Sequence, residues 1–410
     1  MTKKLVSQSL GLLLVTGALV PACSLFGFGS KGSIATAITE RDLKLDKFEV
    51  REMRSGLEGS PEAVCPGQSV ALVTQLDLRH LKKKKLGTVD AGKQGTGDAK
   101  LWGVLQHDNF EYAARGGSIT PEGLFSASPD HLATATTGFQ VGASLKKDPS
   151  KFSVVRDYTP TYCQTAGGMG GQPGMSGNSG TMGSSGSSGE NGGEEKSGGA
   201  GGAGGPGGPG GDGSPGGPGP HVIAHVGAVK TPFHEKLIIV KFSGDADGTM
   251  LFDPNNPVTL YAVGGAGGRG GDGGSGGNGG SGGDGISGGA GGAGGNGGSG
   301  GNGSDGGPGG NLEVIIDDNA AWIDPLIQLD VSGGPGGSPG SAGYGGSGGS
   351  GGATKIEGGS AGANGPAGAD GVAGSGHGND GPPGVSSKTM GDVAASFSDL
   401  PEGVEYLAGE

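Results

Sequence analysis

The chain has 410 residues, of which 103 are glycine and only 5% are aromatic, and its formal net charge is −13. A usual glycine share is near ~7%, so this composition excludes a single large hydrophobic core. Any conventional core must lie in the glycine-poor segments. The negative charge argues against nucleic acid as a partner, because binding to phosphates requires clustered lysine and arginine.

The first 22 residues have the layout of a secretory signal peptide. Lys3 and Lys4 supply a cationic start, and the apolar run over residues 10–20 is too short to span a bilayer. We interpret residues 1–22 as a signal peptide and residues 23–43 as a tether to the rest of the chain.

The segment Val20-Pro21-Ala22-Cys23 resembles the lipobox of bacterial lipoproteins, in which a branched apolar residue lies three places before the cysteine. In that family the cysteine is lipidated and becomes the new N-terminus. The resemblance implies a lipid anchor on Cys23 with the membrane as partner. Because Ser24 follows, it also implies passage to the outer membrane of the cell envelope, facing either the surface or the periplasm. An ordinary signal peptide with a chance cysteine is the alternative.

Two cysteines, Cys65 and Cys163, are left once Cys23 is acylated. An even pair in an exported chain favours a disulfide. The bond would close a loop of about a hundred residues, which in the chain-entropy treatment contributes on the order of 4–5 kcal/mol. Metal binding by two lone cysteines is a poor competitor.

Residues 44–165 are predicted to form a disulfide-bearing β-sandwich. Short stretches of alternating apolar and polar residues are separated by Gly, Pro and Asp, which is typical of an antiparallel sandwich. The string from Gly117 to Ala127 resembles the strand-turn-strand of bacterial immunoglobulin-like domains, and implies that fold. The predicted strands are 44–50, 69–76, 101–105, 110–114, 139–145 and 152–155.

Residues 264–311 consist almost entirely of the triplet Gly-Gly-X, whose second place fails only at Ile286 and Ser304. A period of three is the repeat of the polyproline II helix, with about 3.1 Å rise per residue. Glycine on two of three faces lets such helices pack together, so the pattern predicts a bundle of polyglycine II helices. The alternatives are a disordered spacer and a collagen-like trimer, which needs more proline than Pro308 alone supplies.

Two further glycine blocks, 166–220 and 333–387, keep glycine at every third place over most of their length. The first block loses this phase at residues 194–196, which we interpret as a bend between two helices because charged residues cannot enter a glycine-lined contact. The last block slips at residues 354–356 and then continues from Gly359 as a collagen-like run.

Similar bundles are known in some antifreeze proteins, in tips of phage tail adhesins, and beside a β-domain in certain receptor ectodomains. The string from Gly291 to Ser299 is also similar to mycobacterial glycine-rich surface repeats. These are likenesses of a repeat, and they imply no shared activity.

Residues 221–263 and 312–332 are glycine-poor β-strand segments. An Asp-Pro turn, a strand and a glycine block follow one another from Asp253 and again from Asp324, a candidate internal repeat that would attach the glycine helices to a β-sheet. The tail, 388–410, is polar and predicted to be loosely held. The predicted strands are 221–226, 236–242, 258–263, 312–316 and 326–331.

Candidate chemical sites are few. Residues 279–287 match the calcium β-roll pattern once, with Asp284 as ligand, but calcium there needs adjacent copies to complete its oxygen shell. His221 and His225 share a strand face, yet zinc would want a third ligand. Gly-x-Gly-x-x-Gly recurs without a following helix, so a nucleotide fingerprint fails. We predict no catalytic residue, no metal site and no cofactor; the ligand-binding residues stay unidentified.

The predicted class is all-β: an N-terminal immunoglobulin-like β-sandwich and a β-domain that bears polyglycine II bundles. The predicted function is a non-catalytic, lipid-anchored envelope protein with a structural or adhesive role, whose partners are cell-surface glycans or envelope proteins. One alternative is a carbohydrate- or ice-binding module that uses the outward X residues. A calcium-binding repeat protein, and an enzyme within residues 221–331, are further alternatives.

Overall fold

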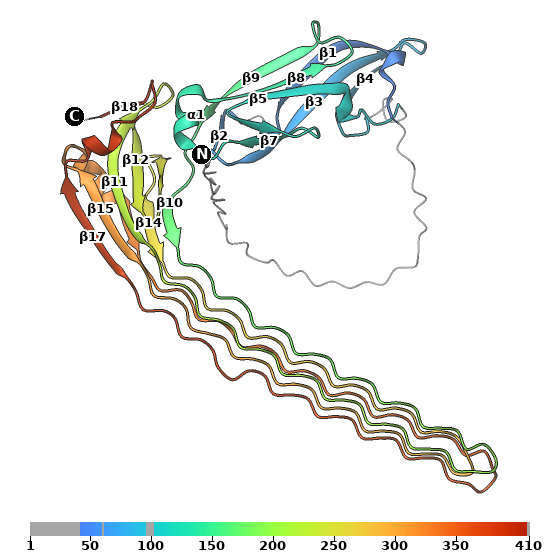
Figure 1. Ribbon diagram of the computed structural model, residues 1–410. Coiled ribbons are helices and arrows are strands. Elements are labelled where there is room, and N and C mark those ends of the chain that lie inside the picture. Colours follow the sequence, from blue (N-terminus) through green and yellow to red (C-terminus); the bar gives the residue numbers. More distant parts are fainter. Residues whose placement is uncertain (1–41, 60, 96–101, 408–410) are drawn as a thin grey trace, which may run out of the picture. The chain divides into compact units, whose positions relative to one another are not determined.

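A computed structural model describes residues 42–59, 61–95 and 102–407 (Figure 1). Strands are the main regular secondary structure of the described residues, which confirms the predicted all-β class. The proposed signal peptide and Cys23 lie outside them. The predicted tether ends inside them, because Asp42 bridges Val104 and Leu43 is buried.

Two sheets build the N-terminal module. One has the order β1-β3-β7-β6, with β4 also on β3, and the other has the order β2-β9-β8-β5. The first sheet comprises β1 (Phe48–Leu57), β3 (Ser69–His80), β4 (Leu86–Asp90), β6 (Gly117–Ile119) and β7 (Leu124–Ala127). The second comprises β2 (Ala63–Val64), β5 (Phe110–Arg115), β8 (Phe139–Leu145) and β9 (Ser153–Pro160).

Alternation along these strands builds the core between the sheets. In β3 every second side chain from Leu72 to Leu78 is buried, since successive side chains of a strand point to opposite faces. Phe125 and Phe139 meet edge to face, with ring centroids 6.1 Å apart. Cys65 and Cys163 form the predicted disulfide, across a sequence separation of 98 residues.

Helical turns interrupt this pattern in places that the sequence did not indicate. The predicted strand at 44–50 begins as the 3-10 turn η1 (Leu45–Lys47), and β1 then continues to Leu57. A second 3-10 turn is η3 (His107–Asn109). The helix α1 (His131–Thr137) was not predicted; Asp130 caps it by accepting the Ala133 N–H at 3.0 Å.

Two further sheets follow in the chain. The smaller sheet is parallel throughout and contains β10 (Ala166–Gly170), β14 (Val258–Val263) and β16 (Ile327–Asp330). The larger has the order β13-β12-β11-β15-β17, with β18 on β11. It contains β11 (His221–Lys230), β12 (Leu237–Gly244), β13 (Gly248–Phe252), β15 (Asn311–Asp317), β17 (Val385–Gly391) and β18 (Glu405–Tyr406).

Apolar side chains from both of these sheets share one core, which includes Val222, Phe252, Leu260, Leu312 and Val314. The two strands of the candidate repeat, β14 and β16, lie side by side in parallel register. The 3-10 segment η4 (Asp318–Leu326) connects β15 to β16.

The tail is held in place, so the prediction of a loose polar tail was wrong. Its apolar residues Val393, Phe397 and Val404 are buried against β11 and β12, around the 3-10 turn η5 (Ala394–Phe397). Tyr406 donates its hydroxyl to the buried carboxylate of Asp317. These buried side chains and the pairing of β18 with β11 fix the tail.

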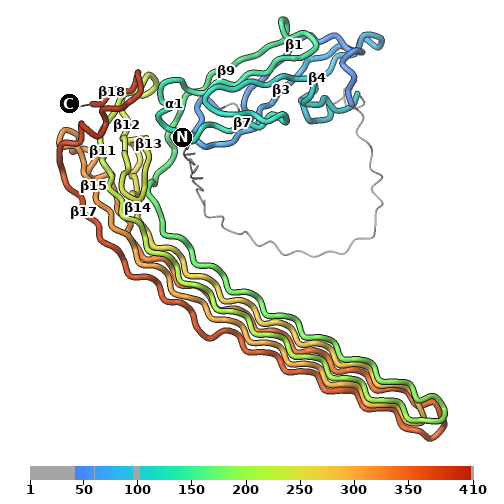
Figure 2. The backbone as a smooth tube through the Cα atoms, viewed as in Figure 1, coloured from blue at the N-terminus to red at the C-terminus, as the bar shows by residue number. Residues whose placement is uncertain are grey.

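Six glycine segments leave and re-enter these sheets (Figures 1 and 2). β10, β14 and β16 lead into the first, third and fifth segments, and the second, fourth and sixth segments lead into β11, β15 and β17. We number them in chain order as 171–192, 198–219, 264–285, 288–310, 333–353 and 359–384.

The chain reverses at three places along the glycine blocks. It turns at residues 193–197 and again at 354–358, both of which are phase breaks noted in the sequence. It also turns at Ile286 and Ser287, so residues 264–311 are two antiparallel segments and not one continuous run. Gly193 and Gly358 adopt φ of 66° and 86°, a conformation that glycine adopts without strain.

Backbone hydrogen bonds between segments hold the six together. First-place glycines of the first segment donate to the third, as from Gly174 N–H to the Ala266 carbonyl at 2.7 Å. Those of the third donate to the fifth, as from Gly267 to Pro335 at 2.8 Å. The second, fourth and sixth segments are joined in the same way, as from Gly291 to Ala363. Two layers result, and further bonds link the layers.

Glycine density follows the number of segments to which each segment is bonded. The first and sixth segments bond to two others and keep one glycine per triplet, whereas the remaining four bond to three or four others and keep about two. At these glycines an added Cβ would overlap the backbone of the next segment; at Gly276 it would meet the Gly295 carbonyl. Glycine is therefore required wherever two backbones approach each other.

Candidate functional site

Third-place residues of the glycine segments form two opposite faces. In the third segment, a Cβ on Gly264 would meet the fourth and fifth segments and one on Gly265 would meet the first, so only the third place points outward. The serine face consists of the third-place residues of the third and fifth segments: Ala266, Arg269, Asp272, Ser275, Asn278, Ser281, Asp284, Pro335, Ser338, Ser341, Tyr344, Ser347, Ser350 and Ala353.

The opposite face, which we call the Ala/Pro face, consists of the third-place residues of the second and fourth segments. Nine of its fourteen positions are alanine or proline, against three of fourteen on the serine face, and it has no lysine or arginine. Its members are Ala200, Ala203, Pro206, Pro209, Asp212, Pro215, Pro218, Ala290, Ala293, Asn296, Ser299, Asn302, Asp305 and Pro308.

Asparagine and aspartate side chains on both faces link neighbouring segments through hydrogen bonds, and we call these residues staples. No third-place N–H of these faces donates to a carbonyl across the bundle, and where an Asn or Asp lies beside it on the neighbouring segment, the side-chain oxygen accepts that N–H. Asp272 accepts the Ser341 N–H at 2.7 Å, and Asn278 accepts the Ser347 N–H at 3.0 Å. The outward amide and carboxyl groups are thus already bonded within the chain, which limits their use in binding ice or sugar.

Asp284, the calcium candidate, is another staple. Its Oδ1 accepts the Ala353 N–H at 2.8 Å and its Oδ2 lies 3.1 Å from Lys355 Nζ. The backbone bond from Ala353, followed by Lys355, holds the pKa of this carboxyl below its ordinary value of 3.8. Across the described ranges, no three His, Cys, Asp or Glu side chains gather as a metal site would require.

Removing one staple should weaken the bundle measurably. We expect Asn278→Ala to lower the free energy of unfolding by about 0.5–1 kcal/mol, because the Ser347 N–H loses its acceptor. Ser275→Ala, one triplet earlier on the same segment, removes a hydroxyl that has no partner in the described chain and should stay within about 0.5 kcal/mol. Thermal unfolding measures the change in the free energy of unfolding of both variants. Equal losses would contradict the role of Asn278 in linking the segments.

Low pH should weaken the hydrogen bonds that the aspartate staples accept. The Ser341 N–H is the main cause that holds the pKa of Asp272 below its ordinary value of 3.8. Because the folded-state pKa is lowered, this stabilisation is complete above pH 3.8 and is lost as pH falls through the folded-state value. The melting temperature of the wild type should therefore fall more below pH 3.8 than that of Asp272→Asn, whose amide oxygen still accepts the bond. Equal decreases in the melting temperature of the two chains below pH 3.8 would exclude this role for Asp272.

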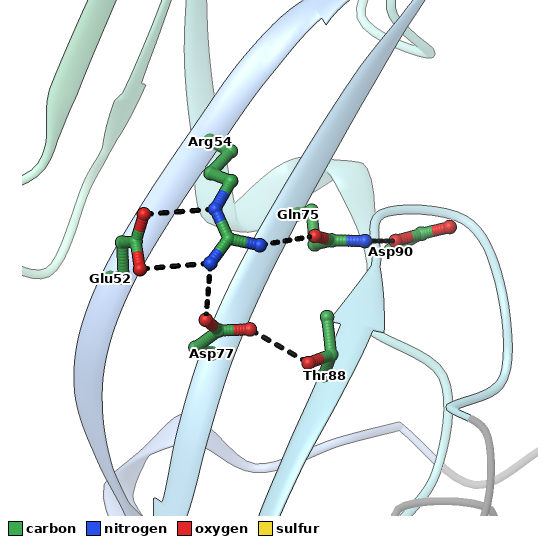
Figure 3. Close-up of polar contacts among 6 residues, drawn as sticks. All are labelled: Glu52, Arg54, Gln75, Asp77, Thr88 and Asp90. Carbon is green, nitrogen blue, oxygen red and sulfur yellow. Dashed lines mark hydrogen bonds and ion pairs between the residues drawn. The ribbon is translucent and has the colours of Figure 1, made fainter.

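A second polar cluster lies on the sandwich (Figure 3). Arg54 of β1 donates to both carboxylate oxygens of Glu52, at 2.8 and 2.9 Å, to Asp77 at 2.8 Å and to Gln75 at 3.0 Å. Asp77 also accepts the Thr88 hydroxyl. The cluster thus joins β1, β3 and β4 across an exposed sheet face, where ion pairs contribute little to stability.

An open cleft of about 760 Å³ adjoins this cluster, between the edges of β1 and β9. Arg156 donates its Nε–H to the Ser55 carbonyl at 2.8 Å, and Tyr158 accepts the Leu57 N–H at 2.9 Å. Side chains of β9 therefore cap the edge of β1 and connect the two sheets. Sequence reasoning missed this site; the spacing of Glu52 and Arg54 on one strand face was its only signal.

His221 and His225, the residues considered for zinc, both lie on β11. Asp245, in the loop between β12 and β13, accepts the His221 N–H at 2.8 Å. His225 lies on β11, opposite Lys241 of β12.

Comparison with known proteins finds no matching family model, no matching curated protein and no matching solved structure. Within the described residues, no helix has the length and apolar character needed to cross a membrane.

Proposed function

We propose that the six glycine segments are polyglycine II helices and that the chain is a lipid-anchored, non-catalytic protein of the bacterial cell envelope. Its N-terminal sandwich, in this proposal, is immunoglobulin-like. Its glycine bundle is a stiff arm with a structural or adhesive role toward envelope proteins or surface glycans.

The lateral hydrogen bonding carries this proposal. Bonds recur every third residue between segments, as at Gly171, Gly174 and Gly177, and three residues per turn is the repeat of this helix. The 22 residues of segment 171–192, at about 3.1 Å each, would extend roughly 70 Å. A spacer without order would leave these backbone groups to water.

The lipid anchor is tested by metabolic labelling. Cells that produce the wild-type chain should incorporate radiolabelled palmitate into it, and cells that produce Cys23→Ser should not. If the wild-type chain carries no label, the lipid anchor is excluded, whereas the proposal for the glycine bundle still stands.

The arm is tested by shortening it. Deleting two triplets at one level of every segment preserves the glycine phase and should reduce the maximum dimension in small-angle X-ray scattering by about 19 Å. Adhesion of cells to a glycan- or protein-coated surface should also decrease, because the shortened bundle extends less far from the cell. An unchanged maximum dimension would favour a flexible spacer. The deletions are 177–182, 207–212, 269–274, 296–301, 337–342 and 368–373.

Carbohydrate binding is the second candidate, and Tyr344 is the observation that favours it. This ring is 74% exposed on the serine face, between Ser341 and Ser347 of the same segment. An exposed aromatic ring among hydroxyls offers an apolar surface and hydrogen-bonding groups together. On a glycan array, Tyr344→Ala should lose any signal that the wild type shows, and equal signals would exclude this site.

A further inference from the structure

Asparagine is followed by glycine at five places in the chain, and all five lie in the glycine segments. An Asn-Gly pair is prone to spontaneous deamidation, because glycine has no Cβ to shield its backbone nitrogen. That nitrogen attacks the side-chain carbonyl carbon, and a cyclic imide forms while the glycine proton leaves with the amide nitrogen as ammonia. Water then opens the imide to aspartate or isoaspartate. The five asparagines are Asn191, Asn278, Asn296, Asn302 and Asn364.

The pairing of segments occupies both of the groups that react. In the third segment, Asn278 Oδ1 accepts the Ser347 N–H at 3.0 Å, and the Gly279 N–H donates to the Ser347 carbonyl at 2.8 Å. The asparagine side chain is thus bonded to the neighbouring segment, whereas the reaction needs it against its own backbone. The glycine nitrogen cannot turn toward that side chain without breaking its own hydrogen bond. Imide formation therefore requires the two segments to separate at this point.

The other four pairs are bonded in the same way. Asn296 accepts the Ala369 N–H at 2.9 Å, and the Gly297 N–H donates to the Ala369 carbonyl at 2.9 Å. Both reactive groups are occupied at every Asn-Gly pair of the chain. The residues that supply the N–H and the carbonyl for the remaining pairs are Asp284 for Asn191, Gly376 for Asn302, and Gly351 and Gly349 for Asn364.

Aspartate followed by glycine closes the same ring with loss of water, and the bundle holds those pairs too. Six lie in the glycine segments, and each carboxylate accepts an N–H from a neighbouring segment, as Asp305 does from Asn379 at 2.7 Å. The seventh, Asp247-Gly248, lies outside the bundle, and its exposed carboxylate accepts no hydrogen bond within the described ranges. Asp247 is therefore an unprotected reference in the same chain. The six are Asp212, Asp272, Asp284, Asp305, Asp370 and Asp380.

Conversion to isoaspartate is incompatible with the bundle. The backbone then runs through the side-chain carbon, so every later residue of that segment is displaced by one backbone atom. Glycines that must face another backbone lose that position, as Gly282 would after a change at Asn278. Each conversion also adds a negative charge to a chain whose net charge is already −13. A segment that has reacted while open cannot pair again in the same register.

We propose that the five asparagines are modification sites that the paired bundle keeps unreactive and that deamidate once the segments separate. Pairing and chemical integrity are then linked. A bundle that stays closed keeps its asparagines, and a chain that stays open loses the ability to form a bundle. This protection goes beyond the proposed envelope role, and it depends on the hydrogen bonds between segments and not on lipidation of Cys23.

Liquid chromatography and mass spectrometry of peptides, after incubation of the full chain at mildly alkaline pH, measure the reaction at each site. Deamidation of Asn278 should be at least about tenfold slower in the folded chain than in guanidinium chloride, because only the opened fraction reacts. Isomerisation of Asp247 should differ much less between the two conditions, since no hydrogen bond holds its carboxylate.

Ser347→Pro isolates one protecting bond. It removes the N–H that Asn278 accepts and keeps the carbonyl that Gly279 uses. Proline already occupies the same place of a triplet at Pro335. In the folded variant, Asn278 should deamidate about two- to fivefold faster than in the wild type, which is the effect of losing one hydrogen bond. The matched control Ser350→Pro, one triplet later, removes an N–H that no asparagine of the described chain accepts, and should react as the wild type does.

Equal deamidation of Asn278 in the folded and the unfolded wild type would overturn the proposal. So would an unchanged rate in Ser347→Pro, or an equal increase in Ser350→Pro, with thermal melts showing that both variants are folded. Wild-type chain that is aged in guanidinium chloride should regain less protection of its glycine amides from exchange than chain that is unfolded and refolded at once. Full recovery of the aged chain would refute the loss of pairing.

Discussion

Gly276→Val should lower the free energy of unfolding of the glycine bundle by at least about 3 kcal/mol. The new Cβ would overlap the Gly295 carbonyl, with the Asn296 carbonyl close behind. Both obstacles are backbone, which has no rotamer to change. Overpacking costs about 1–3 kcal/mol, and each interchain bond lost as the segments separate adds about 1 kcal/mol.

The control for this change is the residue before it. Ser275→Val adds the same side chain at a third-place position that points outward, and should move the free energy by about 0.5 kcal/mol or less. Thermal melts and amide exchange of the glycine N–H groups report the difference. Similar melts for the two valine variants would mean that the segments do not pack as described.

The double variant Cys65→Ser/Cys163→Ser is expected to lose about 4–5 kcal/mol of sandwich stability. The disulfide spans 98 residues, and a closed loop of that size removes this much entropy from the unfolded chain in the chain-entropy treatment. The bond also fixes Cys65, next to the short edge strand β2, to the end of the module at Cys163.

Urea unfolding monitored by tryptophan fluorescence measures this loss, since Trp102 packs against the sandwich core. Reduction of the wild type should reproduce the variant's midpoint. A midpoint that neither reduction nor substitution moves would show that the loop is already constrained in the unfolded chain.

Much of the β-structure follows from alternation in the sequence. The predicted strand 139–145 coincides with β8, and the predicted strand 258–263 with β14. In both, burial on one or both faces leaves a clear apolar pattern. The disulfide followed from counting cysteines, because the predicted export and the predicted lipidation of Cys23 leave two thiols with one possible pairing.

Other elements depend on contacts that a local pattern does not encode. α1 has only seven residues and three are threonine, a poor helix former, so its cap at Asp130 and its packing decide it. The tail residues Val393, Phe397 and Val404 lie four and seven residues apart, which is a helical spacing, yet only the 3-10 turn η5 forms and Pro401 follows it.

The staples were also beyond sequence reasoning, and the layering was missed although it left a signal. Asp272 and Ser341 are 69 residues apart, and only the offset between segments brings them together. The number of glycines per triplet, by contrast, is visible in the sequence. It rises with the number of segments to which a segment is bonded. Ile286, where the second-place glycine is missing, likewise marks a turn, whereas Ser304, the other such place, lies within the fourth segment.

The absence of bonds within any one glycine segment governs how this protein can fold. Each segment gains hydrogen bonds only from residues elsewhere in the chain, as Gly174 does from Ala266 and Gly267 from Pro335. The shortest-range bonds lie at the turns, as from the Gly289 N–H to the Gly283 carbonyl, and most of the others join residues far apart in the sequence. The contact order is therefore high, which slows folding. We expect the bundle to gain most of its bonds only once residues 171–384 have all been synthesised.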